Sequence, residues 1–269
     1  MIPGAILLDW QREHPWPLMA QVEQDLVISR GLVALFESPL LADHLVFRGG
    51  TALHKIHLPT PYRYSEDLDF VQIRAGPIGP IFDAVRGTLE PWMGKCQRKQ
   101  GPGVVTLIFK VQSESPDGRT MRVKIEINSR EHFSILGVIA KPFVVSSPWF
   151  QGAATVPTFR LEEMLGSKLR ALYQRQKIRD LFDIWIALTQ GQVDARTVVR
   201  CFRKFLSFQG VRVSATEFRQ NLDAKLARPD YLYDVQSLMR PDMRFVPEEA
   251  ADIVRREILD RLDERDTEA

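Results

Sequence analysis

The spacing of apolar and polar residues predicts different elements in different parts of the chain. Apolar side chains recur at helical spacing through residues 18–36, which predicts an amphipathic helix there. Residues 121–127 instead alternate from one position to the next, which predicts a half-buried strand. One face of this strand carries Val123, Ile125 and Ile127, and the other carries Arg122, Lys124, Glu126 and Asn128.

The remaining pattern separates a strand-rich half from a helical half. Further strands are predicted at 45–47, 67–71 and 104–111, and helices at 78–92, 161–188 (as two helices), 195–206, 216–226 and 248–264. A turn is predicted at 115–118, where Ser, Pro, Asp and Gly follow one another. We therefore predict an α+β fold with a catalytic domain at 1–155 and a helical domain at 156–269.

Composition is that of an ordinary globular protein, with 45% hydrophobic and 26% charged residues in 269. No apolar run has the length of about 20 residues that spans a bilayer, and the first residues do not form a signal peptide. Cys96 and Cys201 lack metal-ligand or redox spacing. These features predict a cytoplasmic protein that does not use a membrane.

Charge is unevenly distributed although the net charge is only +2. Residues 160–228 contain fourteen Lys and Arg against seven Asp and Glu. Residues 240–269 contain six basic residues against ten acidic ones. The basic segment fits a phosphate-rich partner, and it also fits a plain solvated helical surface.

The candidate chemistry begins with Asp67 and Asp69, which are two residues apart in a predicted strand. Both carboxylates therefore leave the same face, and their mutual repulsion favours a counter-cation. A divalent ion with oxygen ligands, such as Mg²⁺ or Mn²⁺, is the natural solution beside a triphosphate. Taken alone, the pair also fits a solvated strand edge.

Two further features favour the metal site. Gly49, Gly50 and Thr51 lie where a predicted strand passes into a helix, with Thr51 as the expected helix cap. Glycines at such a junction let backbone N–H groups approach a phosphate, although a tight turn would need them too. Glu126 lies on a neighbouring strand and could complete the metal ligands, although a lone strand Glu usually faces solvent.

The last feature is a stripe of basic residues in the predicted helices. On one continuous helix Lys168, Arg175 and Arg179 would share a face with leucines, which suggests a partly buried anion site for a triphosphate. Asp180 and Asp183 follow directly, as orienting partners or as an acidic group near an attacking hydroxyl. A salt-bridged helix surface is the alternative.

Together these segments resemble the AbiEii/AbiGii family of nucleotidyltransferase toxins, within the DNA-polymerase-β-like nucleotidyltransferase superfamily. The matching residues run from 45 to 190, and those beyond 190 match no motif. The segments that carry the resemblance are Phe47–Lys55, Arg63–Phe70, Lys124–Ile127, Lys168–Leu172, Arg175, Arg179–Asp180 and Asp183.

The resemblance implies a nucleotidyltransferase-type mixed β-sheet with flanking helices and roles for particular residues. Asp67 and Asp69 would bind Mg²⁺ and the NTP, with Glu126 as a further metal ligand. Gly49, Gly50 and Thr51 would bind phosphate, and Lys168 would contact the triphosphate with Arg175 and Arg179 nearby. Asp180 or Asp183 would be the late catalytic aspartate. Ser65 occupies a place where some family members are phosphorylated by an antitoxin kinase.

The resemblance also implies an acceptor and a partner. Related toxins add nucleotides to the 3′ end of tRNA, and many are encoded beside an AbiEi-type antitoxin. The predicted reaction is attack of a 3′-hydroxyl on the α-phosphate of an NTP with loss of pyrophosphate. Two alternatives remain open: the same transfer to a protein or small molecule, and an NTP-binding module without turnover.

Overall fold

The computed structural model describes residues 2–113 and 120–263 and divides the chain into two compact units. The first unit is Met1–Phe159 and the second is Arg160–Ala269. The predicted domain boundary at 155/156 lies inside the last strand of the first unit, β7 (Gln151–Phe159). We describe each unit by itself.

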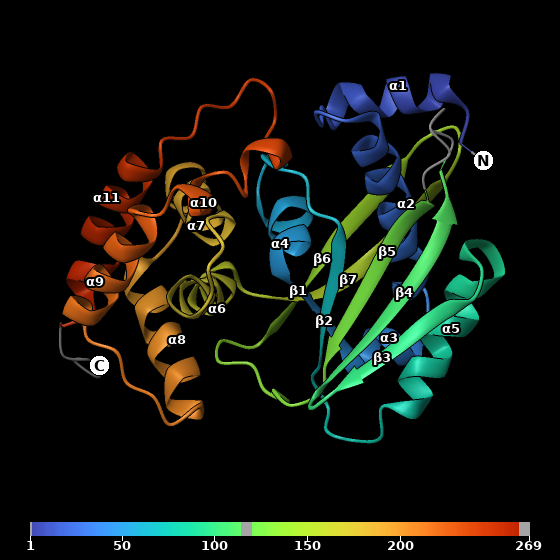
Figure 1. The fold of residues 1–269 in the computed structure, drawn as a ribbon. Coiled ribbons are helices and arrows are strands. Elements are labelled where there is room, and N and C mark those ends of the chain that lie inside the picture. Colours follow the sequence, from blue (N-terminus) through green and yellow to red (C-terminus); the bar gives the residue numbers. More distant parts are fainter. Residues whose placement is uncertain (1, 114–119, 264–269) are drawn as a thin grey trace. The chain divides into compact units, whose positions relative to one another are not determined.

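A seven-stranded mixed sheet organises the first unit, in the order β3-β4-β5-β2-β1-β7-β6 (Figure 1). β2 pairs antiparallel with β1 and parallel with β5, which places these three strands at the centre. Edge hairpins extend the sheet on both sides. The strands are β1 (Leu45–Arg48), β2 (Asp67–Gln72), β3 (Cys96–Gly101), β4 (Val104–Gln112), β5 (Thr120–Asn128), β6 (Val138–Ser146) and β7.

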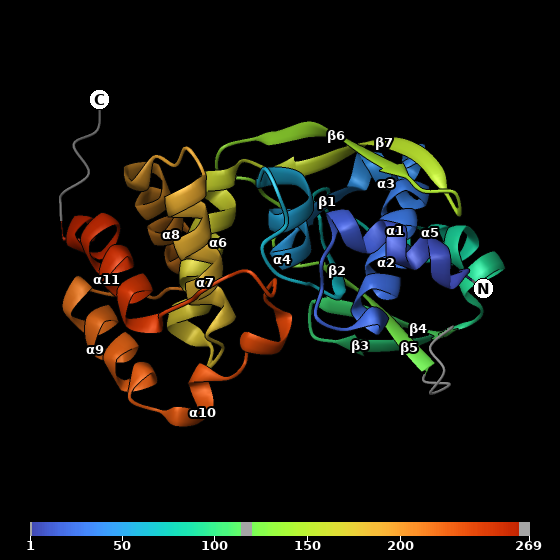
Figure 2. The ribbon, with the colours of Figure 1, turned by 90° about the horizontal axis from the view of Figure 1, so that it is seen from above.

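Helix α2 (Met19–Phe36) forms the centre of the core of this unit. It contacts β2, β5, β6 and β7, and Figure 2 shows it lying within the curve of the sheet. Because the helix is covered on several sides, it is apolar around most of its circumference rather than on one stripe. Val22, Leu26, Ile28 and Leu32 are all fully buried.

Shorter helices complete the first unit. α1 (Gly4–Glu13) packs on α2, and α5 (Gly79–Met93) contacts both α2 and α3 (Pro39–His44). After β1 the chain passes directly into α4 (Gly49–Ala52), which continues as a π-helical turn, η1 (Leu53–His57). The helix ends before Pro59 and Pro61, as their missing N–H groups predict.

The second unit is helical. α6 (Leu161–Gln174) contacts α7 (Arg179–Gln190) and α8 (Ala195–Phe208). The C-terminal end of α6 is closed by Lys225, whose ammonium donates to the carbonyls of Leu172 and Tyr173. The remaining helices are α9 (Ala215–Leu226), α10 (Pro229–Leu232), η2 (Gln236–Leu238), α11 (Pro247–Glu257) and η3 (Leu259–Arg261).

The structure confirms the predicted elements that have clear periodicity. It also contains three strands that the sequence pattern does not predict, and it shortens one predicted helix. β3, β6 and β7 were not predicted. The predicted helix 248–264 ends at Glu257 and gives way to a 3₁₀ turn, where Arg261 binds the carbonyls of Arg256 and Glu257. Its last residue and the predicted turn at 115–118 lie outside the described residues.

Thr51 is not the helix cap that the sequence suggests. The cap position is Arg48, and α4 begins at Gly49, so Thr51 lies inside the first turn. Its hydroxyl is instead hydrogen-bonded to the backbone carbonyl of Asp67, at 2.5 Å, and to the Ser65 hydroxyl. Thr51 therefore ties the helix to the start of β2.

None of the helices in the described ranges, 2–113 and 120–263, combines the length and apolar character needed to cross a membrane.

Candidate active site

Three carboxylates lie side by side on the central strands. In the register of the sheet Asp69 is paired with Glu126 of β5, and Asp67 is paired with Lys124. Residues paired across neighbouring strands point to the same face. The structure therefore brings together Asp67, Asp69 and Glu126, which the sequence could only suggest from separate segments.

These carboxylates lie on the face of the sheet that α2 does not cover. Phe70 packs edge to face against Phe36 of α2, with ring centroids 5.8 Å apart, and it is buried. Because successive side chains of a strand point to opposite faces, Asp67 and Asp69 point away from α2. Because apolar and acidic residues alternate in β2, one face of the strand packs in the hydrophobic core and the other carries the carboxylates.

Lys124 also belongs to this group, although the sequence alone predicts no role for it in the site. Its amino group lies 3.5 Å from Asp67 and forms an ion pair with Glu126. Burial works against its charge, but the hydrogen bond to Glu126 and the charge of Asp67 raise the pKa of Lys124. Its position opposite Asp67 depends on strand register, which the sequence does not reveal.

The pKa of Asp69 reflects an excess of negative charge in this group. Burial, together with the charges of Asp67 and Glu126, raises the pKa of Asp69 to about 6. Arg48 and Lys124 oppose this shift without cancelling it. A cation of higher charge than lysine would relieve the remaining repulsion.

The donor set fits a divalent cation. Three carboxylates on two paired strands supply the oxygen ligands that Mg²⁺ or Mn²⁺ prefers. Within the part of the chain that the structure describes, no three His, Cys, Asp or Glu side chains are already arranged around a common ligand position. Lys124 lies between Asp67 and Glu126 instead, so a metal bound by all three would have to displace its amino group.

Gly49 and Gly50 lie between β1 and the carboxylates. Gly49 has φ of +84°, a conformation that favours glycine. A Cβ atom there would overlap the Asp69 carboxylate, and one at Gly50 would overlap the guanidinium of Arg63. Both glycines are therefore required by close approach of Asp69, Arg63 and Ser65.

Ser65 belongs to the same cluster. Its hydroxyl is 2.9 Å from the Thr51 hydroxyl and faces the position that a Cβ on Gly50 would occupy. Arg63 is buried nearby and donates to the carbonyl of Tyr64. The segment before β2 thus packs against the glycines after β1.

In the second unit the structure joins Lys168 to the predicted aspartates. The Lys168 amino group is 2.5 Å from Asp183 and 3.8 Å from Asp180. All three side chains are buried, and Asp183 is completely so. Lys168 leaves α6 while both aspartates leave α7, so this cluster depends on the packing of the two helices.

The basic stripe predicted on a continuous helix is wrong. α6 ends at Gln174, and Arg175 is its C-terminal cap in an extended conformation. Arg179 begins α7 after a four-residue break. Arg175 is exposed and Arg179 is partly buried, so neither shares a helical face with Lys168.

Comparisons with known proteins agree with this architecture. The family model described as "Nucleotidyl transferase AbiEii toxin, Type IV TA system" matches residues 30–260. Among solved structures, the chain is similar to MenT4, a nucleotidyltransferase toxin from Mycobacterium tuberculosis H37Rv. The TM-score is 0.67 at 19% identity, over 99% of this chain and 91% of MenT4.

A second similar structure is JHP933 from Helicobacter pylori, with a TM-score of 0.55 at 21% identity. That match covers 92% of this chain and 95% of JHP933. No curated protein matches the chain. The two structural likenesses show a shared fold, and the family model extends over most of the sequence. The chain belongs to the AbiEii family of nucleotidyltransferase toxins.

Proposed function

We propose that this nucleotidyltransferase moves a nucleoside monophosphate from an NTP to the 3′ end of tRNA and thereby blocks translation. The observation that carries the proposal is the group Asp67, Asp69 and Glu126, held in register on β2 and β5 beside the glycines of α4. The acceptor is supported by the family and by the basic composition of residues 160–228. We place the reaction in the cytoplasm, where tRNA is found.

The reaction makes one P–O bond and breaks another. The acceptor hydroxyl attacks the α-phosphate and gives its proton to a carboxylate or to water, and the bond to the β-phosphate breaks to release pyrophosphate. Backbone N–H groups at Gly49 and Gly50 would hold phosphate oxygens close to the carboxylates. A divalent cation, Mg²⁺ or Mn²⁺, bound by Asp67, Asp69 and Glu126 would neutralise charge on the triphosphate.

In the second unit we assign Lys168 to binding of the triphosphate. Asp183 is fully buried and only 2.5 Å from the Lys168 amino group, so it fixes the direction of that ammonium. Asp180 lies farther from Lys168, at 3.8 Å. We therefore propose Asp183 as the positioning residue and Asp180 as the late catalytic aspartate. Arg175, which is exposed, and Arg179, which is half-buried, are assigned to further phosphate contacts.

We also propose that an AbiEi-type antitoxin is the partner of this toxin. Ser65 offers a simple point of control, because its hydroxyl lies against Thr51 and close to Gly50. A phosphate on Ser65 would place negative charge where the NTP phosphates are expected to bind. Binding of the triphosphate would then be opposed by like charge.

The proposal is tested by incubating the protein with each α-labelled NTP, Mg²⁺ and total tRNA. We expect label from one or more NTPs to enter tRNA, with pyrophosphate released, and Asp69→Asn to abolish the transfer. Asp83→Asn is the matched control, because Asp83 is exposed on α5 and away from the strands that carry the carboxylates.

Other outcomes separate the alternatives. Label in protein or in a small molecule, but not in RNA, would contradict the tRNA acceptor while keeping the chemistry. Binding of an NTP without release of pyrophosphate would indicate a module without turnover. Equal labelling by wild type and Asp69→Asn would refute the assigned site.

A further inference from the structure

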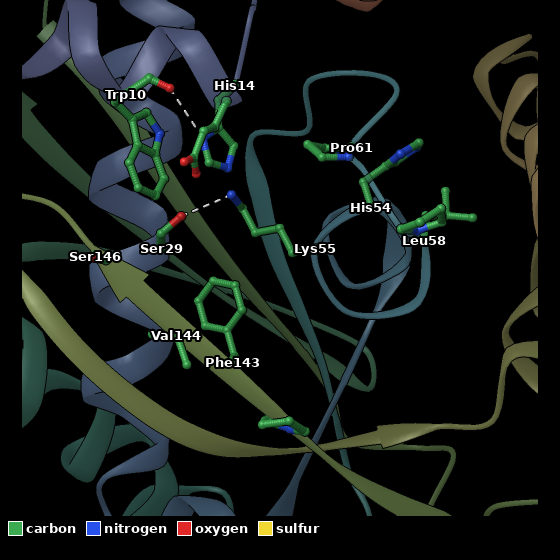
Figure 3. A pocket seen from close by; sticks show the side chains of 13 residues that line it. Trp10, His14, Ser29, His54, Lys55, Leu58, Pro61, Phe143, Val144 and Ser146 are labelled. Carbon is green, nitrogen blue, oxygen red and sulfur yellow. Dashed lines mark hydrogen bonds between the residues drawn. The ribbon is translucent and has the colours of Figure 1, made fainter.

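A second concave site lies in the first unit, away from the carboxylates. It has a volume of about 410 Å³ and is formed by α1, α2, η1, β6 and the loop after η1 (Figure 3). This volume falls within the range of small-molecule sites. Phe143 and Pro61 form part of its lining, and the Trp10 ring, which also lines it, is stacked on the ring of His14.

Buried polar groups form the floor of this pocket. The Lys55 amino group lies 2.7 Å from Asp25 and 2.9 Å from the Ser29 hydroxyl. Its side chain is only 7% exposed, and Trp10 donates a second hydrogen bond to Asp25. An ammonium has three N–H groups, and the third finds no acceptor among residues 2–113 and 120–263. Figure 3 shows this amino group directed into the space near Ser29 and His14.

The charges of the lining select the kind of ligand. Asp25 neutralises Lys55, and burial lowers the pKa of His14, so its ring is uncharged at neutral pH. Glu13 is exposed at the rim and adds a negative charge. A phosphate would therefore meet no net positive charge. A neutral molecule with a carbonyl to accept from Lys55 and hydroxyls to donate to Glu13 satisfies both groups.

The pocket is separate from the catalytic face but shares a helix with it. Lys55 contacts Asp25 and Ser29 of α2, which covers the face of the sheet opposite Asp67 and Asp69. His54 and Lys55 also follow Gly49–Ala52 in one continuous helical segment. The part that carries Lys55 is a π-helical turn, a rare geometry that is frequent at functional sites.

We propose that this pocket is a second ligand site, which binds a neutral nucleoside. The planar base packs against Phe143 and the prolyl side chains, and a base carbonyl accepts the third N–H of Lys55. The ribose hydroxyls donate to the Glu13 carboxylate at the rim. A nucleoside carries no phosphate, so it cannot be the NTP substrate of the catalytic face.

The test is a titration of the full chain with adenosine, guanosine, cytidine and uridine, without NTP or metal, by calorimetry or ligand-observed NMR. We expect at least one of guanosine, cytidine and uridine to bind more tightly than adenosine, whose base has no carbonyl. Glu13→Gln should weaken that binding about tenfold, as loss of a hydrogen bond to a charged group does. Glu13 is exposed, so this variant folds. Asp9→Asn is the matched control, because it makes the same charge change on α1 outside the pocket.

Asp69→Asn identifies which face is occupied. We expect it to leave nucleoside binding unchanged, because Asp69 lies on the opposite face of the sheet. The proposal is overturned if none of guanosine, cytidine and uridine binds more tightly than adenosine, if Glu13→Gln binds as tightly as wild type, or if Asp69→Asn abolishes binding. Because no NTP or metal is present, each result is independent of the nucleotidyl-transfer assay.

Discussion

Two lysine–carboxylate clusters in this protein have the same chemistry but different surroundings. In the first unit Lys124 pairs with Asp67 and Glu126, and about a third of each side chain is exposed, at 35%, 29% and 33%. In the second unit Lys168 pairs with Asp183, and these side chains are 10% and 0% exposed. The comparison suggests that the exposed lysine can be exchanged for another cation, whereas the buried one is fixed.

The physical reason is the cost of separating the charges. An exposed ion pair contributes about 0–1 kcal/mol, because water replaces a lost partner. Removing one partner of a buried pair leaves the other charge without solvent and costs about 3–5 kcal/mol. The Lys168–Asp183 pair should therefore contribute to the stability of the fold, in addition to its proposed role in binding the triphosphate, whereas the Lys124 cluster should contribute little to stability.

The largest expected effect comes from breaking the buried cluster. Asp183→Ala should lower the free energy of unfolding by about 3–5 kcal/mol, because Lys168 loses its closest partner. Asp67→Ala should change it by about 1 kcal/mol or less, because loss of the ion pair is offset by relief of repulsion at Asp69. Urea unfolding of both variants measures the difference. Equal losses would show that exposure does not distinguish the two clusters.

A second prediction concerns stability at acid pH, which depends on a buried histidine of the first unit. Like the Lys168 cluster, this group cannot rely on solvent to stabilise a charge. Burial, with a smaller effect of the Lys141 charge, lowers the pKa of His57 from 6.5 to about 4. Its ring nitrogen Nε2 lies 3.2 Å from the Thr158 hydroxyl, which itself donates to the Phe47 carbonyl. The native state therefore holds His57 neutral with Nε2 as the donor.

Between pH 6.5 and 4 the unfolded chain binds a proton that the native state does not bind. The contribution of His57 is thus fully present above pH 6.5 and is lost as the pH falls through this window, by about 3 kcal/mol in total. Unfolding by urea at pH 7 and pH 4.5 should show this loss in wild type and a smaller one in His57→Gln. An unchanged pH slope in the variant would contradict the assignment.

The sequence predicts best those elements that the core alone determines. α2 is marked by a long run that is apolar around most of its circumference, and β5 by strict alternation with one buried face; both agree with the prediction within a residue or two. β6 is rich in Val, Ile and Phe, but Pro142 interrupts it, and β7 contains Pro157 and several small residues, so neither segment carries a continuous strand signal. They become strands because β1 offers β7 a partner and β7 offers one to β6.

The residues of the candidate site also fall into those that the sequence predicts and those that it does not. Asp67 and Asp69 could be found from their spacing, and Gly49 and Gly50 from their place after a strand. The role of Lys124 could not, because it depends on pairing with Asp67 across β2 and β5. The prediction that Arg175 shares a helical face with Lys168 is wrong because it assumes one continuous helix, whereas the chain breaks between α6 and α7. Spacing within one element is readable, but contact between elements is not.

A third prediction tests the close packing that holds the exposed cluster. Gly49→Ala should lower the free energy of unfolding by about 1–3 kcal/mol, because φ is +84° and the new Cβ overlaps Asp69. Gly79→Ala is the control, since nothing lies within 4 Å of a Cβ there. Thermal or urea unfolding compares the two. A neutral Gly49→Ala would mean that this turn adapts freely.

The smallest expected effect comes from replacing Lys124, and it tests directly whether a divalent cation can take the place of this lysine. Lys124→Met removes the cation that lies between Asp67 and Glu126, so a divalent ion no longer competes with an ammonium for these oxygens. Affinity for Mn²⁺ without NTP should rise by about 1 kcal/mol, or roughly fivefold. Lys110→Met is the control, because Lys110 is exposed on the adjacent strand β4.

Calorimetry or Mn²⁺ electron paramagnetic resonance measures this affinity without depending on catalysis. Weaker Mn²⁺ binding in Lys124→Met would mean that the lysine organises the carboxylates rather than standing in for the metal. That result would make the exposed cluster resemble the buried one, in which Lys168 and Asp183 hold each other in place. Tighter binding, with Lys110→Met unchanged, would establish that partial exposure leaves the three carboxylates free to exchange one cation for another.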